Sequence, residues 1–432
     1  MSSWLVIDSE SILCDRGTHD PACGAVRQLP TLGVIHPSAT VLSPSDAAIG
    51  RKSLKRPQQE QCGERPAGLP DSHPQCIAPA RVLRGPDALI QGLPLIRDLG
   101  KVPFLLGPGA AAAQQREQLA ESLALTGGQQ GRLHHDCCDS DLRRLEQEAR
   151  AATADLIIAM GGGKVLDAGK LLAHSLALPV VTIPTSAATC AGWTALANVY
   201  SEAGAFRGDV ALNSCPELLI FDHGLVASAP PRTLASGIAD GIAKWYEASV
   251  SSRDSQDSFV MQAVQQARLL RDLLLLEGIG AMEKPGSAEW IHVVEACGLS
   301  AGLIGGLGGA RCRTVAAHAV HNGLTQSPRC RGWLHGEKVG VGILVQLRLE
   351  EVLGAQPLAA VAREQLLPFY ERLGLPASLW DLGLGEASLA DLLEICRFAC
   401  REGSDLHHLP FPVSPEQLLT ALVEIPCART AG

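Results

Sequence analysis

The segment Asp155-Leu-Ile-Ile-Ala-Met-Gly161-Gly162-Gly163-Lys164-Val-Leu-Asp167-Ala-Gly-Lys170 joins a short apolar run to three glycines and a longer helical pattern. The apolar run predicts a buried strand, and the glycines predict the tight turn that leads from this strand into a helix. Backbone N–H groups at such a turn, together with the helix dipole, favour an anion such as a diphosphate. An ordinary strand-to-helix turn has the same features, so the segment alone leaves both interpretations open.

The alternation of strand and helix extends to both sides of this segment. Further strands are predicted at 81–85, 102–106 and 180–184, and helices at 87–99, 110–125 and 141–153. Asp139 or Ser140 is the expected cap of the last of these helices. After Pro231 the strand signals stop, and helices are predicted at 234–250, 256–276, 290–303, 315–324, 339–353, 365–373 and 389–398. This order predicts a parallel α/β half, with helices on both faces of its sheet, followed by an all-α half.

Composition excludes several classes of protein. The chain has 432 residues, of which 46% are hydrophobic, so two domains with their own cores are expected. A net charge of −9 without a basic stripe argues against a nucleic-acid partner. No secretory signal begins the sequence, and we find no apolar run of the roughly 18 residues that a membrane span needs. We therefore expect a soluble, cytoplasmic protein with a small-molecule ligand and no membrane partner.

Most of the 14 cysteines are expected to be buried small hydrophobic residues, because they form no regular framework. Two groups nevertheless resemble metal sites, namely His134-His135-Asp136-Cys137-Cys138 and the pair Cys396 and Cys400. Neighbouring side chains of an extended segment alternate in direction, so the first group cannot converge on one ion. The second lacks the further pair that would complete a tetrahedron. We interpret both as structural.

A third group is more informative. His318 and His321 lie three residues apart on a predicted helix and share a face, and His335 follows shortly after them. On another predicted helix, Asp240, Lys244 and Glu247 form one stripe in otherwise apolar surroundings. A buried acid needs a partner or a metal ion, so Asp240 either joins the histidines around an ion or forms an i,i+4 salt bridge with Lys244.

Five motifs occur in one order: GGGKxxD, a strand ending in PT, GxxDxxxxWxEA, HxxHNGLT and HGEKV. In this order they resemble the glycerol dehydrogenases of the iron-containing (group III) alcohol dehydrogenase superfamily, over about residues 78 to 425. The resemblance implies the dehydroquinate synthase-like fold, with a Rossmann-like NAD(P)-binding domain at 78–230 and a helical metal-binding domain at 231–432. Residues 1–77 are expected to be an irregular extension.

The resemblance also implies roles for particular residues. Asp240, His318 and His335 would hold one divalent ion, with zinc favoured over iron, and His321 would relay a proton near the substrate. The glycines Gly161, Gly162 and Gly163, together with Lys164, would bind the diphosphate of NAD or NADP. Other positions that would line the cofactor are Thr185, Leu196 and Tyr200. The implied activity is the interconversion of a small alcohol or polyol and its carbonyl compound, in a homo-oligomer.

Three departures from the family pattern bear on specificity. Cys190 stands where glycerol dehydrogenases have an acid that contacts the polyol, and Trp193 adds bulk nearby. Gly107 stands where an acid would select NAD, and although Arg116 could reach a 2′-phosphate, we expect it to be solvated. Lys244, near the expected metal site, could bind a phosphate.

Two alternatives therefore remain open besides the alcohol dehydrogenase. The first is a relative that acts on a phosphorylated substrate, namely a glycerol-1-phosphate dehydrogenase or a cyclase of the 3-dehydroquinate synthase kind. The second is a non-catalytic protein that binds only a nucleotide, against which the complete set of Asp240, His318 and His335 argues.

Overall fold

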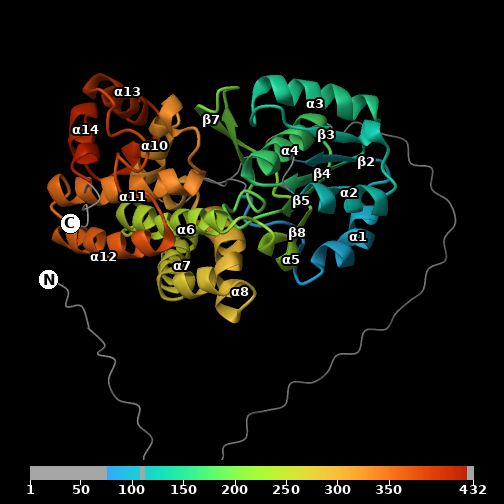
Figure 1. Cartoon of the computed structure of the whole chain (residues 1–432), viewed down its shortest axis with the longest axis horizontal. Coiled ribbons are helices and arrows are strands. Elements are labelled where there is room, and N and C mark those ends of the chain that lie inside the picture. The colour runs from blue at the N-terminus through green and yellow to red at the C-terminus, as the bar shows by residue number, and fades with distance from the viewer. Residues whose placement is uncertain (1–74, 108–111, 426–432) are drawn as a thin grey trace, which may run out of the picture. The chain divides into compact units, whose positions relative to one another are not determined.

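The computed structural model describes residues 75–107 and 112–425 of the chain. The extension expected at residues 1–77 therefore lies outside the described residues, except for its last three. In Figure 1 the described chain runs from a sheet with flanking helices, in blue and green, to a group of helices in yellow, orange and red. This order confirms the fold class expected from the sequence: a parallel α/β half followed by a helical half.

Six parallel strands form the main sheet, in the order β1-β8-β5-β4-β2-β3. Their bounds are β1 Val82–Gly85, β2 Pro103–Gly107, β3 Gln130–Arg132, β4 Leu156–Gly161, β5 Val180–Pro184 and β8 Leu218–Asp222. Because all six run the same way, their carboxyl ends meet at one edge of the sheet. The glycine turn after β4 and the end of β2 are neighbours at this edge.

Alternating side chains of the strands fill two separate cores, as expected for a sheet that is covered on both faces. Leu105, Ile158 and Ile183 belong to one core, which α1 (Ala88–Leu99), α2 (Ala113–Ser122) and α5 (His223–Ala227) complete. Phe104 and Ile157 belong to the other, which α3 (Asp139–Ala151) and α4 (Gly163–Leu176) complete. The helix α4 begins directly at the glycine turn, as the sequence predicts.

The helical half surrounds one large apolar core that also includes Leu219 and Phe221 of β8. Its long helices are α6 (Pro231–Ser251), α7 (Ser258–Glu283) and α11 (His335–Val352). The others are α8 (Ala288–Glu295), α9 (Ala301–Gly308), α10 (Ala316–Leu324), α12 (Pro357–Leu373), α13 (Leu389–Ala399) and α14 (Pro415–Val423). A π-helical turn, Ala296–Ser300, joins α8 to α9.

The structure adds elements that the sequence patterns did not predict. These are β3, β8 and the antiparallel hairpin of β6 (Leu196–Tyr200) and β7 (Phe206–Ala211), together with α5 and α14. One predicted cap is wrong: Cys138 precedes α3, and Asp139 is already its first helical residue. A polar residue near a helix start does not by itself show which residue has the extended backbone of a cap.

One stretch of the described chain, Ala288–Gly308, is long and apolar enough to cross a membrane by length and composition alone. This corrects the expectation that no such run exists. Inside this structure 61% of its 18-residue window is buried, as for a core helix. The stretch includes Trp290 and Ile304, which contribute to the large apolar core.

Candidate active site

Three side chains from three helices converge in the helical half. The His318 Nε2 atom lies 3.3 Å from Asp240 Oδ1, and the His335 Nε2 atom lies 3.7 Å from the same oxygen. Asp240 comes from the middle of α6, His318 from α10 and His335 from the first residue of α11. One ligand atom from each residue lies within 4.8 Å of the other two, so one ion could contact all three.

Two glycines of α11 allow these helices to come so close. A Cβ atom on Gly336 would lie 1.8 Å from the carbonyl oxygen of Ser236 in α6. A Cβ atom on Gly342 would lie 2.2 Å from the carbonyl oxygen of Ala317 in α10. The Gly336 N–H also donates to Ser236 Oγ at 3.0 Å. The HGEK motif therefore places His335 beside Asp240 because its glycine has no side chain.

Glu247, one turn below Lys244 on α6, orients His318. Its Oε2 atom lies 2.7 Å from His318 Nδ1, and its Oε1 atom accepts the backbone N–H groups of Val315 and His318. With Nδ1 donating to Glu247, Nε2 is the ring atom that faces Asp240 and that would offer its lone pair to a metal ion. The sequence indicated Glu247 as part of the stripe, but not this role.

Lys244 and Asp240 form the salt bridge that the sequence left open, with Nζ 3.2 Å from Oδ1 and both side chains buried. Burial alone would raise the pKa of Asp240, but Lys244 and the two histidines outweigh it and hold this pKa well below its usual range. Burial would lower the pKa of His318, but Glu247 and Asp240 raise it. The salt bridge and the histidine cluster therefore coexist.

His321 lies beside these residues, with its ring centroid 4.1 Å from that of His335. Its Nδ1 atom lies 2.9 Å from Asn322 Oδ1, which can fix the tautomer and ring orientation. Burial first, and then the charges of His335 and Lys338, lower the pKa of His321 well below its usual value. His321 is consequently a neutral imidazole at pH 7.

The predicted cofactor residues gather at the carboxyl edge of the sheet. The Thr185 N–H donates to the carbonyl oxygen of Gly161, which joins the PT loop to the glycine turn. Lys164 is 62% exposed and pairs with the buried Asp136, and its ammonium lies 5.9 Å from the ring centroid of Tyr200. Asp136 is a partner that the sequence did not predict.

The backbone of Leu196 takes part in a further hydrogen-bond network. Its carbonyl oxygen accepts a hydrogen bond from the buried ammonium of Lys170, which also bonds to Thr194. Lys170 further pairs with Asp167 at 3.1 Å. This network ties α4 to the start of β6, so that the hairpin lies next to the helix that follows the glycine turn.

Cys190 lies on the loop between β5 and β6 and packs against the large apolar core of the helical half. Burial raises the pKa of its thiol, while the charge of Lys244 lowers this pKa and that of Asp240 raises it. The Trp193 ring packs against Gly302 of α9 and donates from Nε1 to the carbonyl oxygen of Ile77. Trp193 is thus held on the side of the loop that faces α9.

One further group of side chains in the described residues could hold a metal ion. The side chains of His135, Cys138 and Asp141 lie together, a set that differs from the neighbours considered from sequence. However, Asp141 already accepts hydrogen bonds from the backbone of His134 and His135 and from Arg144.

All ten cysteines within residues 75–107 and 112–425 are free, and seven are buried, as expected.

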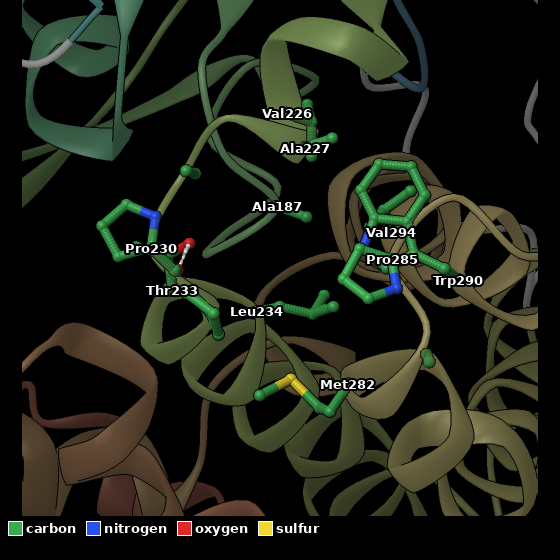
Figure 2. A pocket seen from close by; sticks show the side chains of 13 residues that line it. Ala187, Val226, Ala227, Pro230, Thr233, Leu234, Met282, Pro285, Trp290 and Val294 are labelled. Carbon is green, nitrogen blue, oxygen red and sulfur yellow. Dashed lines mark hydrogen bonds between the residues drawn. The ribbon is translucent and has the colours of Figure 1, made fainter.

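A small apolar cavity of about 50 Å³ lies between the PT loop and the helices α5, α6, α7 and α8. Figure 2 shows Ala187, Leu234, Met282 and Trp290 around it, with Thr233 hydrogen-bonded to the carbonyl oxygen of Pro230. No ionisable side chain lines this cavity, so its lining contains none of the chemistry that the cluster around Asp240 offers.

A parallel sheet with a glycine turn, next to helices that carry an aspartate and two histidines, defines a class of dehydrogenase. Residues 79–223 match the family model described as iron-containing alcohol dehydrogenase. The chain belongs to the iron-containing alcohol dehydrogenase superfamily and is a glycerol dehydrogenase-like member of it. This membership implies NAD(H) and a divalent metal ion.

Individual relatives agree with this assignment. The chain is 59% identical to an uncharacterized oxidoreductase of Synechocystis over 67% of its own length and 75% of that protein. It is 33% identical to hydroxycarboxylate dehydrogenase A of Escherichia coli, over 76% of this chain and 90% of the relative. A probable glycerol dehydrogenase from Sinorhizobium meliloti has a similar structure, with a TM-score of 0.71, 27% identity, and coverage of 80% and 96% of the two chains.

Proposed function

We propose that this protein is a metal-dependent, NAD(P)-linked oxidoreductase that interconverts a small alcohol or polyol and its carbonyl compound. The convergence of Asp240, His318 and His335 within 4.8 Å carries this proposal. One carboxylate and two imidazoles suit zinc and iron alike, and we favour zinc. The relatives, which include a hydroxycarboxylate dehydrogenase and a probable glycerol dehydrogenase, support the reaction class.

The donor set fits a catalytic ion, because three protein ligands leave coordination positions for a substrate. Asp240, His318 and His335 would hold the ion, which when bound supplies a Lewis acid that lowers the pKa of a substrate hydroxyl group. Glu247 keeps His318 in the tautomer that binds. His321, neutral at pH 7, would take the hydroxyl proton and pass it outward.

At the sheet edge, the glycine turn would bind the cofactor diphosphate through backbone N–H groups at the start of α4. Gly162 has no atom within 4 Å of the position a Cβ would take, so a ligand can approach the backbone there. Lys164, Thr185, Leu196 and Tyr200 would line the rest of the cofactor. We also propose that the protein is a cytoplasmic homo-oligomer without nucleic-acid or membrane partners. Light scattering after gel filtration would measure its oligomeric state.

A second candidate is the same fold acting on an anionic substrate. Its supporting observations are the buried ammonium of Lys244 beside Asp240 and the replacement of a family acid by Cys190. The Lys244 ammonium and the loss of an acid at position 190 both make the surroundings of the substrate less negative, which suits a carboxylate or a phosphate on the substrate. A 2-hydroxy acid, glycerol 1-phosphate, or a cyclase reaction of the 3-dehydroquinate synthase kind would meet this description. A cyclase would show no net change in NADH.

The first experiment is to mix zinc-supplemented protein with dihydroxyacetone and NADH or NADPH, with and without a chelator, and to follow nicotinamide absorbance. Oxidation that the chelator abolishes is the expected result. If oxidation occurs only with a 2-oxo acid or a phosphorylated ketone, the second candidate replaces the first. Oxidation that survives complete removal of metal, verified by elemental analysis, would refute the proposal.

A further inference from the structure

Gly107 and Arg116 contact each other at the carboxyl end of β2. A Cβ atom on Gly107 would lie 2.3 Å from Cδ and 3.3 Å from Nε of Arg116. The arginine side chain therefore occupies the space that any side chain at position 107 would need. An acid at this position, which would hydrogen-bond a ribose diol and repel a phosphate, could fit only if Arg116 moved away.

Arg116 is buried, which corrects the expectation that it is a solvated helix residue. Its exposed fraction is 1%, and its buried Nε and Nη1 atoms have no hydrogen-bond partner among residues 75–107 and 112–425. Burial and the nearby charge of Arg132 lower the pKa of Arg116, while Glu117 opposes them. Buried guanidinium N–H groups without acceptors are costly, so an anionic ligand that bonds to them would remove this cost.

A second arginine lies at the same edge. Arg132 is the last residue of β3 and pairs in register with Gly107, and its own side chain is exposed. On the other side of β2 lies β4, whose end carries the glycine turn proposed for the diphosphate. A dinucleotide bound there places its adenosine ribose over the end of the adjacent strand, as in other doubly wound nucleotide-binding sheets.

We propose that Gly107, Arg116 and Arg132 form a binding site for the 2′-phosphate of NADP(H), so that this protein prefers NADP(H) to NAD(H). The inference rests on the proposed dinucleotide-dependent function and deepens it. Because Gly107 has no side chain, Arg116 fits beside it, and the N–H groups of Arg116 donate to the phosphate oxygens. Arg132 adds a second positive charge from the exposed side.

Binding of nucleotide fragments tests the proposed 2′-phosphate site, and it requires neither a bound metal ion nor catalytic turnover. Calorimetry on the full chain would compare adenosine 2′,5′-bisphosphate with 5′-AMP, which lacks the 2′-phosphate. We expect the bisphosphate to bind roughly ten- to a hundredfold more tightly, the range that charge-assisted hydrogen bonds supply. Equal binding of the two fragments would overturn the inference.

Substitutions would show whether Arg116 and Arg132 cause the preference for the bisphosphate. Arg116→Gln and Arg132→Gln should each reduce the preference for the bisphosphate and leave 5′-AMP affinity unchanged, which also reports correct folding. Arg143→Gln, at an exposed position of α3, is the matched control and should change neither affinity. A preference that survives both Arg116→Gln and Arg132→Gln would contradict the assignment.

Whole cofactors separate this inference from the proposed function. Fluorescence titration should give a lower Kd for NADPH than for NADH in the parent protein. If NADH binds more tightly, the inference fails while the dehydrogenase proposal stands. If neither dinucleotide binds, the proposed function fails together with the inference that depends on it.

Discussion

Glu247 contacts His318 through both of its carboxylate oxygens: Oε2 meets the ring Nδ1 at 2.7 Å, and Oε1 accepts the backbone N–H of the same residue at 3.0 Å. One buried acid therefore fixes the helix start, the ring orientation and the tautomer of a single histidine. Mutation of such a hydrogen-bond partner of a metal-binding histidine commonly lowers metal affinity substantially.

Glu247→Gln should lower zinc affinity by about 10- to 100-fold. If the amide oxygen keeps the two backbone N–H groups, the amide NH₂ faces Nδ1 and shifts the ring proton to Nε2, which then cannot bind metal. Competition with a chromophoric chelator measures the change. Glu277→Gln is the matched control, because Glu277 forms a similar 2.9 Å pair with His292 at the surface. Equal zinc affinity of the two variants would refute the role of Glu247.

Gly336→Ala should destabilise the fold by about 2 kcal/mol or more, because its Cβ would overlap the Ser236 carbonyl oxygen. The same displacement of α11 should weaken zinc binding, since it moves His335 away from Asp240. Denaturant unfolding and the zinc titration give the two values. Gly280→Ala in α7, where nothing lies within 4 Å of the new Cβ, should be neutral or stabilise by up to about 1 kcal/mol. Similar losses in both variants would show that the close contact is not the cause.

Glu350 gives a prediction for pH dependence. Burial raises its pKa from 4.5 to about 7, against the opposing effects of Gln346 and Arg253. The folded state thus holds this proton more tightly than the unfolded state, so this residue makes stability fall as the pH rises from about 4.5 to about 7. Glu350→Gln should remove that fall and stabilise the protein by at most about 3 kcal/mol above pH 7. Unfolding at pH 5 and pH 8 tests this, with the exposed Glu386→Gln as control; equal effects at both pH values would contradict it.

Cys190→Asp should increase the ratio of kcat/KM for glycerol to kcat/KM for propan-1-ol by about tenfold or more. The carboxylate can accept hydrogen bonds from a second substrate hydroxyl, whereas a thiol is a weak acceptor. Cys190→Ser keeps the size without the charge and should change the ratio less. Zinc content must be equal in all three proteins. If the parent protein already favours glycerol as strongly as the aspartate variant does, Cys190 does not control this choice.

The fold class and the order of most strands and helices along the chain were predictable, because hydrophobic periodicity and glycine turns are local signals. The strand of Leu156–Gly161 and the helix that follows it show this, since each is encoded within its own segment. The three-residue β3 and the hairpin of β6 and β7 escaped prediction. Their existence depends on pairing with other strands, which no local pattern reports.

The candidate site was predictable in its residue types but not in its contacts. The motifs indicated Asp240, His318 and His335, and the structure gathers them, while their role as ligands stays a prediction. Nothing in the spacing showed that Glu247 would reach His318, because these residues come from different helices. Arg116 looked like a solvated residue because its helix is polar, but in the folded chain it is buried and packs beside Gly107.

The backbone contact between Gly336 and Ser236 also limits which residues of this protein can be replaced during evolution. At Gly336 no side chain can be added without separating α6 and α11, so natural or laboratory selection has little freedom at this position. Cys190 lies outside this contact, on the loop that joins β5 and β6, and its side chain is only partly buried. New substrate ranges in descendants of this protein should therefore arise by replacing residues of that loop, while the helices that present Asp240 and His335 stay the same.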